Sequence, residues 1–214
     1  MICVSIGNVS VEECLSIIAA NQMSEVRLDL LDLTDNDIKK IFSSGKNIIA
    51  TCKTNGKLTE NDSISLLTKA LEAGAAYVDL DIDSSDDLKN KVMELAKKKG
   101  KKIIISYHNC KSTPSREDLV KIVNRCKNYH PDVIKIVGVS HSNNDNVRLL
   151  SLLDSDIPMI VIGMGEKGRI TRFAAPLLGA FCTFVGVSQL NQTAFGQSTK
   201  EELETFLRSF KTQL

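Results

Sequence analysis

Short apolar runs rich in β-branched residues alternate with segments of helical periodicity along the whole chain. Each run has the length and composition of a buried strand. The eight runs are Ile2–Ile6, Glu25–Leu30, Ile48–Lys53, Tyr77–Ile82, Lys102–Tyr107, Val133–Val137, Met159–Gly163 and Phe181–Val185. The pattern predicts eight β-strands.

The segments between the runs carry apolar stripes and helix-end signals. Ile64, Leu67 and Leu71 form one stripe, which stops at Gly74. Polar pairs three residues apart are typical of helix N-termini. Such pairs are Thr34 with Asp37, Ser115 with Asp118, and Thr199 with Glu202. Helices are therefore predicted between the strands.

Strands that alternate with helices require parallel pairing, and eight such units close into a (β/α)8 barrel. The units fill residues 1–214, so we expect one α/β domain, a single (β/α)8 TIM barrel. An open doubly wound sheet is the alternative. Its glycine-rich signature after the first strand is absent, because Gly7-Asn8-Val9-Ser10 holds one glycine.

The balance of charged residues bears on which partners the protein can bind. The 214 residues include 27 basic and 26 acidic side chains, a net charge of +1, which gives no long-range attraction to nucleic acid or to an acidic membrane. No basic leader precedes the first apolar run, and the uncharged stretch from Phe173 is interrupted by Pro176 and glycines. We expect a cytoplasmic protein without nucleic-acid or membrane partners, and the apolar outer helices leave a homodimer open.

The six cysteines suggest neither disulfides nor a metal site. They lack C-x-x-C spacing, and most lie in apolar runs, where a free cysteine behaves as a small hydrophobe. His108 and Cys110 with Cys126 and His130 form a grouping like a zinc site, but Cys126 falls on an apolar helix stripe. No metal site is predicted.

Charges alternate with apolar residues in two of the predicted strands. Glu25, Arg27 and Asp29 share one face of the second strand, and apolar helices should cover the opposite face. The fourth strand repeats the pattern with Asp79, Asp81 and Asp83. We expect these charges to face a polar barrel interior.

Lys135 lies among β-branched residues in the sixth strand. Burying an unpaired ammonium costs several kcal/mol, so this lysine needs an explanation. One is a structural ion pair with Glu25 or an aspartate. The other is a desolvated amine of lowered pKa that attacks a carbonyl and forms a Schiff base.

His108 favours the second explanation. It follows the fifth strand at the end where barrel enzymes place their chemistry, next to the strand of Lys135. An imidazole beside an imine suits removal of a proton from the adjacent carbon and its return to a leaving hydroxyl.

Two later loops lie at the same end of the predicted barrel. The loop from Gly163 to Arg172 opens a helix and carries Arg169 and Arg172, which suits a phosphate or a carboxylate. The uncharged loop 191–198 suits a polyhydroxylated ligand, with an ordinary polar turn as the alternative.

Together these segments resemble type I 3-dehydroquinate dehydratase, the Schiff-base-forming lyase of the shikimate pathway, which leads to chorismate and the aromatic amino acids. The matching pieces are Glu25-Val-Arg27-Leu-Asp29, Ser106-Tyr-His108-Asn with Thr113-Pro114, Asp132-Val-Ile-Lys135, Met164 through Arg172, and Thr193-Ala-Phe-Gly-Gln197.

The resemblance implies a TIM barrel that dehydrates 3-dehydroquinate to 3-dehydroshikimate by syn elimination, without a metal or organic cofactor. According to this resemblance, Lys135 forms the imine, His108 is the general base and acid, and Arg172 holds the substrate carboxylate. It also implies that the ring hydroxyls and carboxylate are bound by Ser5, Glu25, Arg27, Lys53, Thr193 and Gln197, and that the pocket is lined by Met164 and Phe184.

Three positions depart from the family pattern. Lys53 replaces the usual arginine and loses its bidentate fork. Lys57 replaces a glutamate that orients the histidine, so either Glu60 or an interior aspartate substitutes, or proton transfer is slower. Thr193 replaces a serine and keeps the hydroxyl. A sugar-phosphate aldolase and a ligand-binding barrel without turnover stay open as alternatives.

Overall fold

The computed structural model describes residues 1–54, 58–187, 193 and 196–211. Strands and helices alternate in them as predicted. The strands are β1 (Ile2–Ile6), β2 (Ser24–Arg27), β3 (Ile48–Thr51), β4 (Tyr77–Asp81), β5 (Lys102–Asn109), β6 (Val133–Val139), β7 (Met159–Met164) and β8 (Thr183–Gly186). The α-helices are α1 (Val11–Ala19), α2 (Asp35–Ser43), α3 (Glu60–Ala73), α4 (Asp86–Lys98), α5 (Arg116–Lys127), α6 (Asn143–Leu150), α7 (Arg169–Leu177) and α8 (Lys200–Lys211).

The strand order is β7-β6-β5-β4-β3-β2-β1-β8, so strands that follow one another in the chain are neighbours in the sheet. This is the order expected when every crossover contains a helix. The chain divides into two compact units: the N-terminal unit is Cys3–Ile105, and the C-terminal unit is Ser106–Leu214 with Met1–Ile2.

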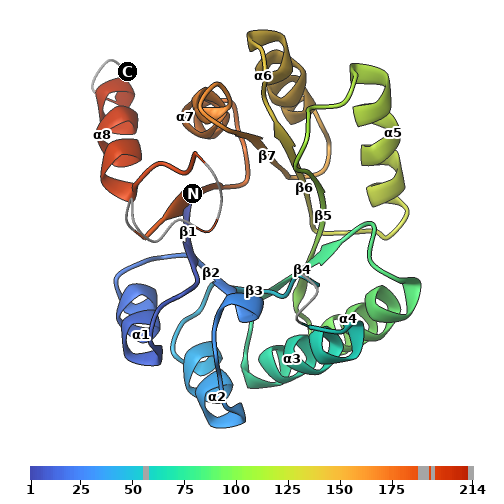
Figure 1. Cartoon of the computed structure of the whole chain (residues 1–214), viewed down its shortest axis with the longest axis vertical. Coiled ribbons are helices and arrows are strands. Elements are labelled where there is room, and N and C mark those ends of the chain that lie inside the picture. Colours follow the sequence, from blue (N-terminus) through green and yellow to red (C-terminus); the bar gives the residue numbers. More distant parts are fainter. Residues whose placement is uncertain (55–57, 188–192, 194–195, 212–214) are drawn as a thin grey trace. The chain divides into compact units, whose positions relative to one another are not determined.

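In the N-terminal unit, β1 to β4 pair in parallel, with α1 to α4 along their outer side (Figure 1). The register sets Ser5 beside Glu25, and Thr51 between Arg27 and Asp79. Since neighbouring positions on parallel strands share a face, the register gathers polar side chains from four strands.

The helix ends follow the predicted signals. Thr34 and Asp37 form a reciprocal capping box at the start of α2, and α3 stops at Gly74, whose φ is 123°. Thr199 and Glu202 bond in both directions at the start of α8. At α5, Ser115 caps the helix through its hydroxyl alone.

The predicted second strand was too long. β2 ends at Arg27, and Leu28–Leu30 form a 3-10 turn. The guanidinium of Arg27 explains the turn, because Asp29 bends back and accepts two hydrogen bonds from it. Asp29 therefore does not continue the strand face, and Lys53 and Asp83 also lie beyond their strands.

In the C-terminal unit, β6 and β7 pair in parallel, with Lys135 beside Ile160 and Gly138 beside Gly163. Helices α5, α6 and α7 flank these strands (Figure 1). The backbone N–H of Thr183 in β8 donates to the carbonyl of Met1 at 3.1 Å.

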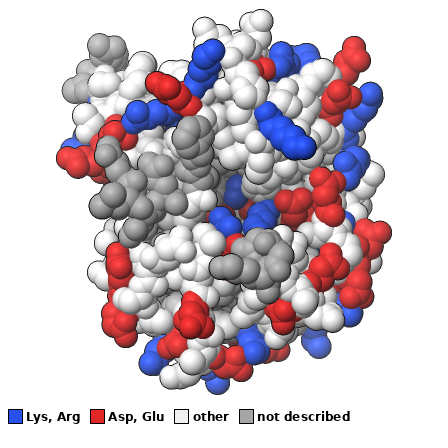
Figure 2. Space-filling view, in the orientation of Figure 1, with Lys and Arg blue, Asp and Glu red and all other residues white. Residues whose placement is uncertain are grey.

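The surface carries both signs of charge. Figure 2 shows acidic and basic side chains interspersed over the described residues of one face. Among the residues the structure describes, no helix is long and apolar enough to span a membrane. The same residues contain no cluster of three metal-ligating side chains, and none of the six cysteines forms a disulfide there.

Candidate active site

Glu25 is a buried carboxylate held by two hydroxyl groups. The hydroxyls of Ser5 and Thr51 both donate to it, the second at 3.0 Å. Glu25 is 4% exposed, and both donors lie on the strands beside β2. This arrangement fixes the orientation of the carboxylate.

Arg27 is locked by Asp29. Its Nε donates at 2.9 Å to one carboxylate oxygen, and an Nη donates at 2.6 Å to the other. Burial works against the charged guanidinium, but the bonds to Asp29 and the charges of Glu25 and Asp79 outweigh it, so the pKa of Arg27 lies above its usual value. Arg27 is a rigid cation in a charged cluster.

Lys53 is held by two aspartates of β4. Its Nζ lies 3.0 Å from Asp81 and 4.0 Å from Asp79. Glu60, one of the expected substitutes for the family glutamate, accepts from the backbone N–H of Ser85 at 3.2 Å. Lys57 itself lies outside the described residues.

Lys135 occupies the middle of β6 in the C-terminal unit and is 5% exposed. Its Nζ lies 4.2 Å from the centre of the Phe184 ring, which belongs to β8. A ring face stabilises a cation through its quadrupole. The aromatic ring predicted as pocket lining therefore lies directly beside the predicted nucleophile.

Arg172 is a nearly fully buried cation in α7, at 1% exposure. One Nη donates to the backbone carbonyl of Phe184 at 2.9 Å, and Nε has no hydrogen-bond partner among the residues that the structure describes. Burial alone lowers its pKa from its usual value to about 10. A buried guanidinium with a free donor is a ready partner for a carboxylate.

In the turn that leads into α7, the backbone of Gly168 packs directly against the backbone of Gly163. A side chain at Gly168 would lie 2.4 Å from the carbonyl carbon of Gly163. Thr171 ties the two together, because its hydroxyl accepts from the Gly163 N–H and donates to the Gly168 carbonyl, both at 2.7 Å. Met164 ends β7 at the start of this turn, and Arg172 follows it.

Thr193 and Gln197 bond to each other in both directions after β8. The Thr193 N–H donates to the Gln197 side-chain oxygen at 2.9 Å, and the Gln197 amide donates back to the threonine hydroxyl at 3.1 Å. The rest of the predicted loop, except Gly196 and Ser198, lies outside the described residues.

His108 lies within β5, because this strand runs on to Asn109 and not only to Tyr107 as predicted. It is partly exposed. The other two histidines, His130 and His141, are exposed, as expected from their positions after element ends.

Two contributions to the site were missed from the sequence. The hydroxyl of Thr51 on Glu25 follows from strand register, which an isolated strand pattern does not specify. The carbonyl of Phe184, which holds Arg172, is a backbone group and leaves no signal in the side-chain pattern.

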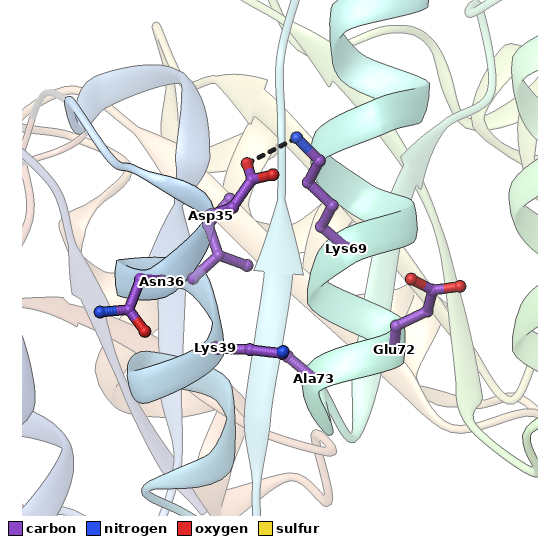
Figure 3. Close-up of a pocket in the computed structure, with 7 residues that line it drawn as sticks. Asp35, Asn36, Lys39, Lys69, Glu72 and Ala73 are labelled. Atoms are coloured by element: carbon purple, nitrogen blue, oxygen red, sulfur yellow. Dashed lines mark hydrogen bonds and ion pairs between the residues drawn. The ribbon is translucent and has the colours of Figure 1, made fainter.

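The structure also has a cavity of about 420 Å³ between α2 and α3 (Figure 3). Lys69 of α3 bonds to Asp35 of α2 at 2.6 Å across it. Both side chains are largely exposed, and none of the predicted site residues lines the cavity. It is therefore a groove between outer helices and not the candidate active site.

Comparison with known proteins places the chain in a family. Residues 2–213 match the family model described as type I 3-dehydroquinase. The chain is 30% identical over 214 residues to 3-dehydroquinate dehydratase of Desulfotalea psychrophila, covering 94% of each protein.

Solved structures agree in fold over the whole chain. A 3-dehydroquinate dehydratase from Geobacillus kaustophilus has a TM-score of 0.84 at 22% identity, covering 99% of this chain and 91% of its own. A type I 3-dehydroquinate dehydratase from Clostridium difficile, with covalently modified comenic acid, has a TM-score of 0.85 at 21% identity, covering 100% and 93%. The predicted (β/α)8 barrel is confirmed by this agreement. The chain belongs to the type I 3-dehydroquinase family.

Proposed function

We propose that this chain dehydrates 3-dehydroquinate to 3-dehydroshikimate through a Schiff base on Lys135, with His108 as general base and acid. The observation that carries the proposal is the arrangement around Phe184. Its ring lies against the Lys135 ammonium, and its carbonyl holds the buried Arg172. Phe184 therefore contacts both the Lys135 amine, proposed to react with the substrate ketone, and the Arg172 cation, proposed to bind the substrate carboxylate.

The reaction follows from these groups. The neutral Lys135 amine attacks the substrate ketone, and loss of water gives the imine. His108 takes a proton from the carbon next to the imine and gives a proton to the hydroxyl that leaves as water. Hydrolysis of the product imine returns the ketone and the free amine.

Arg172 is suited to the substrate carboxylate because it is desolvated before the substrate binds. Within the described part of the chain, its Nε is a hydrogen-bond donor without a partner. An incoming carboxylate satisfies this donor and neutralises a buried charge, so the interaction is stronger than one in water.

The remaining assignments rest on the family motifs. Ser5, Glu25, Arg27 and Lys53 in the N-terminal unit, and Thr193 and Gln197 after β8, are proposed to bind the ring hydroxyls and carboxylate. Met164 is proposed to line the pocket beside Phe184. A single domain over residues 1–214, a cytoplasmic location and a homodimer stay predictions from the sequence.

The test combines turnover with trapping. Purified protein is mixed with 3-dehydroquinate, and the conjugated enone of the product is followed in the ultraviolet. In parallel, borohydride reduction is followed by peptide mass analysis, which should place the adduct on Lys135. Lys135→Ala should abolish both signals, and His108→Ala should keep trapping but lose roughly a hundredfold in turnover.

Two results would contradict the proposal. Binding without product or adduct would favour a ligand-binding barrel. An adduct on another lysine, of which Lys89 is also buried, would move the imine elsewhere. Lys89→Met is therefore the matched control for Lys135→Ala. It removes another buried ammonium, which in the folded protein donates to the carbonyls of Ile82 and Ser84.

A further inference from the structure

The loop between β5 and α5 is fastened to the end of β6. The hydroxyl of Thr113 donates to the carbonyl of Val139 at 2.9 Å, and Thr113 is 7% exposed. Gly138 permits the close approach, because a side chain there would lie 2.9 Å from the Thr113 hydroxyl and 3.2 Å from the Ser112 carbonyl. We name this contact between Thr113, Gly138 and Val139 the threonine latch.

The chain between His108 and the latch is a tight turn. The side-chain oxygen of Asn109 accepts from the N–H groups of Lys111 at 2.9 Å and Ser112 at 3.0 Å. Directly after Thr113, the carbonyl of Pro114 accepts a hydrogen bond from Arg148 at 3.1 Å. Little freedom is left in this segment, so a displacement at Thr113 is transmitted to the end of β5.

The latch joins the strands that carry the two proposed catalytic residues. His108 lies five positions before Thr113, and Lys135 lies three positions before Gly138 in the same strand. We propose that Thr113 is a positioning residue, which fixes the imidazole of His108 relative to the Lys135 amine. The inference rests on the proposed function and deepens it.

A positioning role predicts a specific kinetic result. Thr113→Val keeps the volume and removes the hydroxyl, and a misplaced general base loses rate with little loss of binding. We expect kcat to fall about tenfold or more. KM should stay within about twofold, and borohydride trapping at Lys135 should remain. Thr113→Ser should restore most of the rate because it keeps the donor.

A double-mutant cycle separates positioning from general destabilisation. In a His108→Ala background, Thr113→Val should change the residual turnover less than about twofold, since the group it positions is gone. Ser44→Ala is the matched control, because it removes a hydroxyl bond of 2.7 Å to the Ile41 carbonyl in α2. It should leave the kinetic constants unchanged.

Several outcomes would overturn the inference. An unchanged kcat in Thr113→Val, or an equal loss in both backgrounds, excludes a role through His108. If Thr113→Val does not fold, Gly138→Ala displaces the latch from the other side and must show the same non-additivity. Failure of the unmodified protein to form adduct or product would instead refute the proposed function, and the inference with it.

Discussion

The ammonium of Lys135 lies 4.2 Å from the centre of the Phe184 ring. The protonated imine of the proposed reaction carries its positive charge on this nitrogen, so the ring favours the charged imine over its neutral form. In the proposed reaction the ring therefore stabilises the charged intermediate.

Phe184→Leu tests this stabilisation. The substitution keeps an apolar side chain and removes the π face, whose interaction with a buried cation is worth about 1–2 kcal/mol. We expect the rate of borohydride trapping at saturating substrate to fall about fivefold to thirtyfold. An unchanged trapping rate would show that Phe184 only fills space.

Arg172→Met should have opposite effects on folding stability and on substrate binding. Burial lowers the Arg172 pKa to about 10, so the unfolded chain holds more protons than the folded one in the pH range between this value and the higher pKa of an unfolded arginine. The charged form is therefore destabilising, fully so below pH 10, and this cost fades as the pH rises through that window. At pH 7 we expect the variant to have a higher urea midpoint.

The same variant should bind substrate poorly. Loss of the carboxylate partner should raise KM at least about tenfold, since charge-assisted bonds contribute more than neutral ones. A variant with a lower urea midpoint and unchanged KM would contradict both parts, because Arg172 would then be a structural cation.

Asp29→Asn should loosen Arg27 without unfolding the protein. The amide retains one acceptor but loses the bidentate charge pair that holds the guanidinium. We expect KM to rise several-fold, measured in the enone assay. The control is Asp35→Asn, which breaks the exposed pair with Lys69 and should change stability by less than about 1 kcal/mol.

The sequence was sufficient for the strand-helix alternation, because eight β-branched runs and polar pairs such as Thr34 with Asp37 are local signals. It also singled out Lys135, since a charge among β-branched residues stands out, whereas the role predicted for Arg172 came from the family resemblance. It failed at Asp29, where the alternation continues although the chain turns toward Arg27. It also left the Thr113 bond to Val139 unpredicted, because that contact joins residues 26 positions apart.

Gly168 and Gly100 should respond differently to alanine. At Gly168 the added carbon would lie 2.4 Å from the backbone of Gly163, so the turn before Arg172 must open. At Gly100, where φ is 63°, it meets nothing within 4 Å, and the cost is only that of a left-handed backbone. Urea unfolding should give a loss of about 1–2 kcal/mol for Gly100→Ala.

Gly168→Ala should lose about 3 kcal/mol or more and should also weaken substrate binding, because the displaced turn leads into α7, which carries Arg172. Gly100→Ala should leave KM unchanged, since Gly100 follows α4, is none of the residues proposed to bind substrate, and an added carbon there meets nothing within 4 Å. Equal stability losses in the two variants would show that the turn before α7 adapts, and would remove backbone packing as the reason for glycine at position 168.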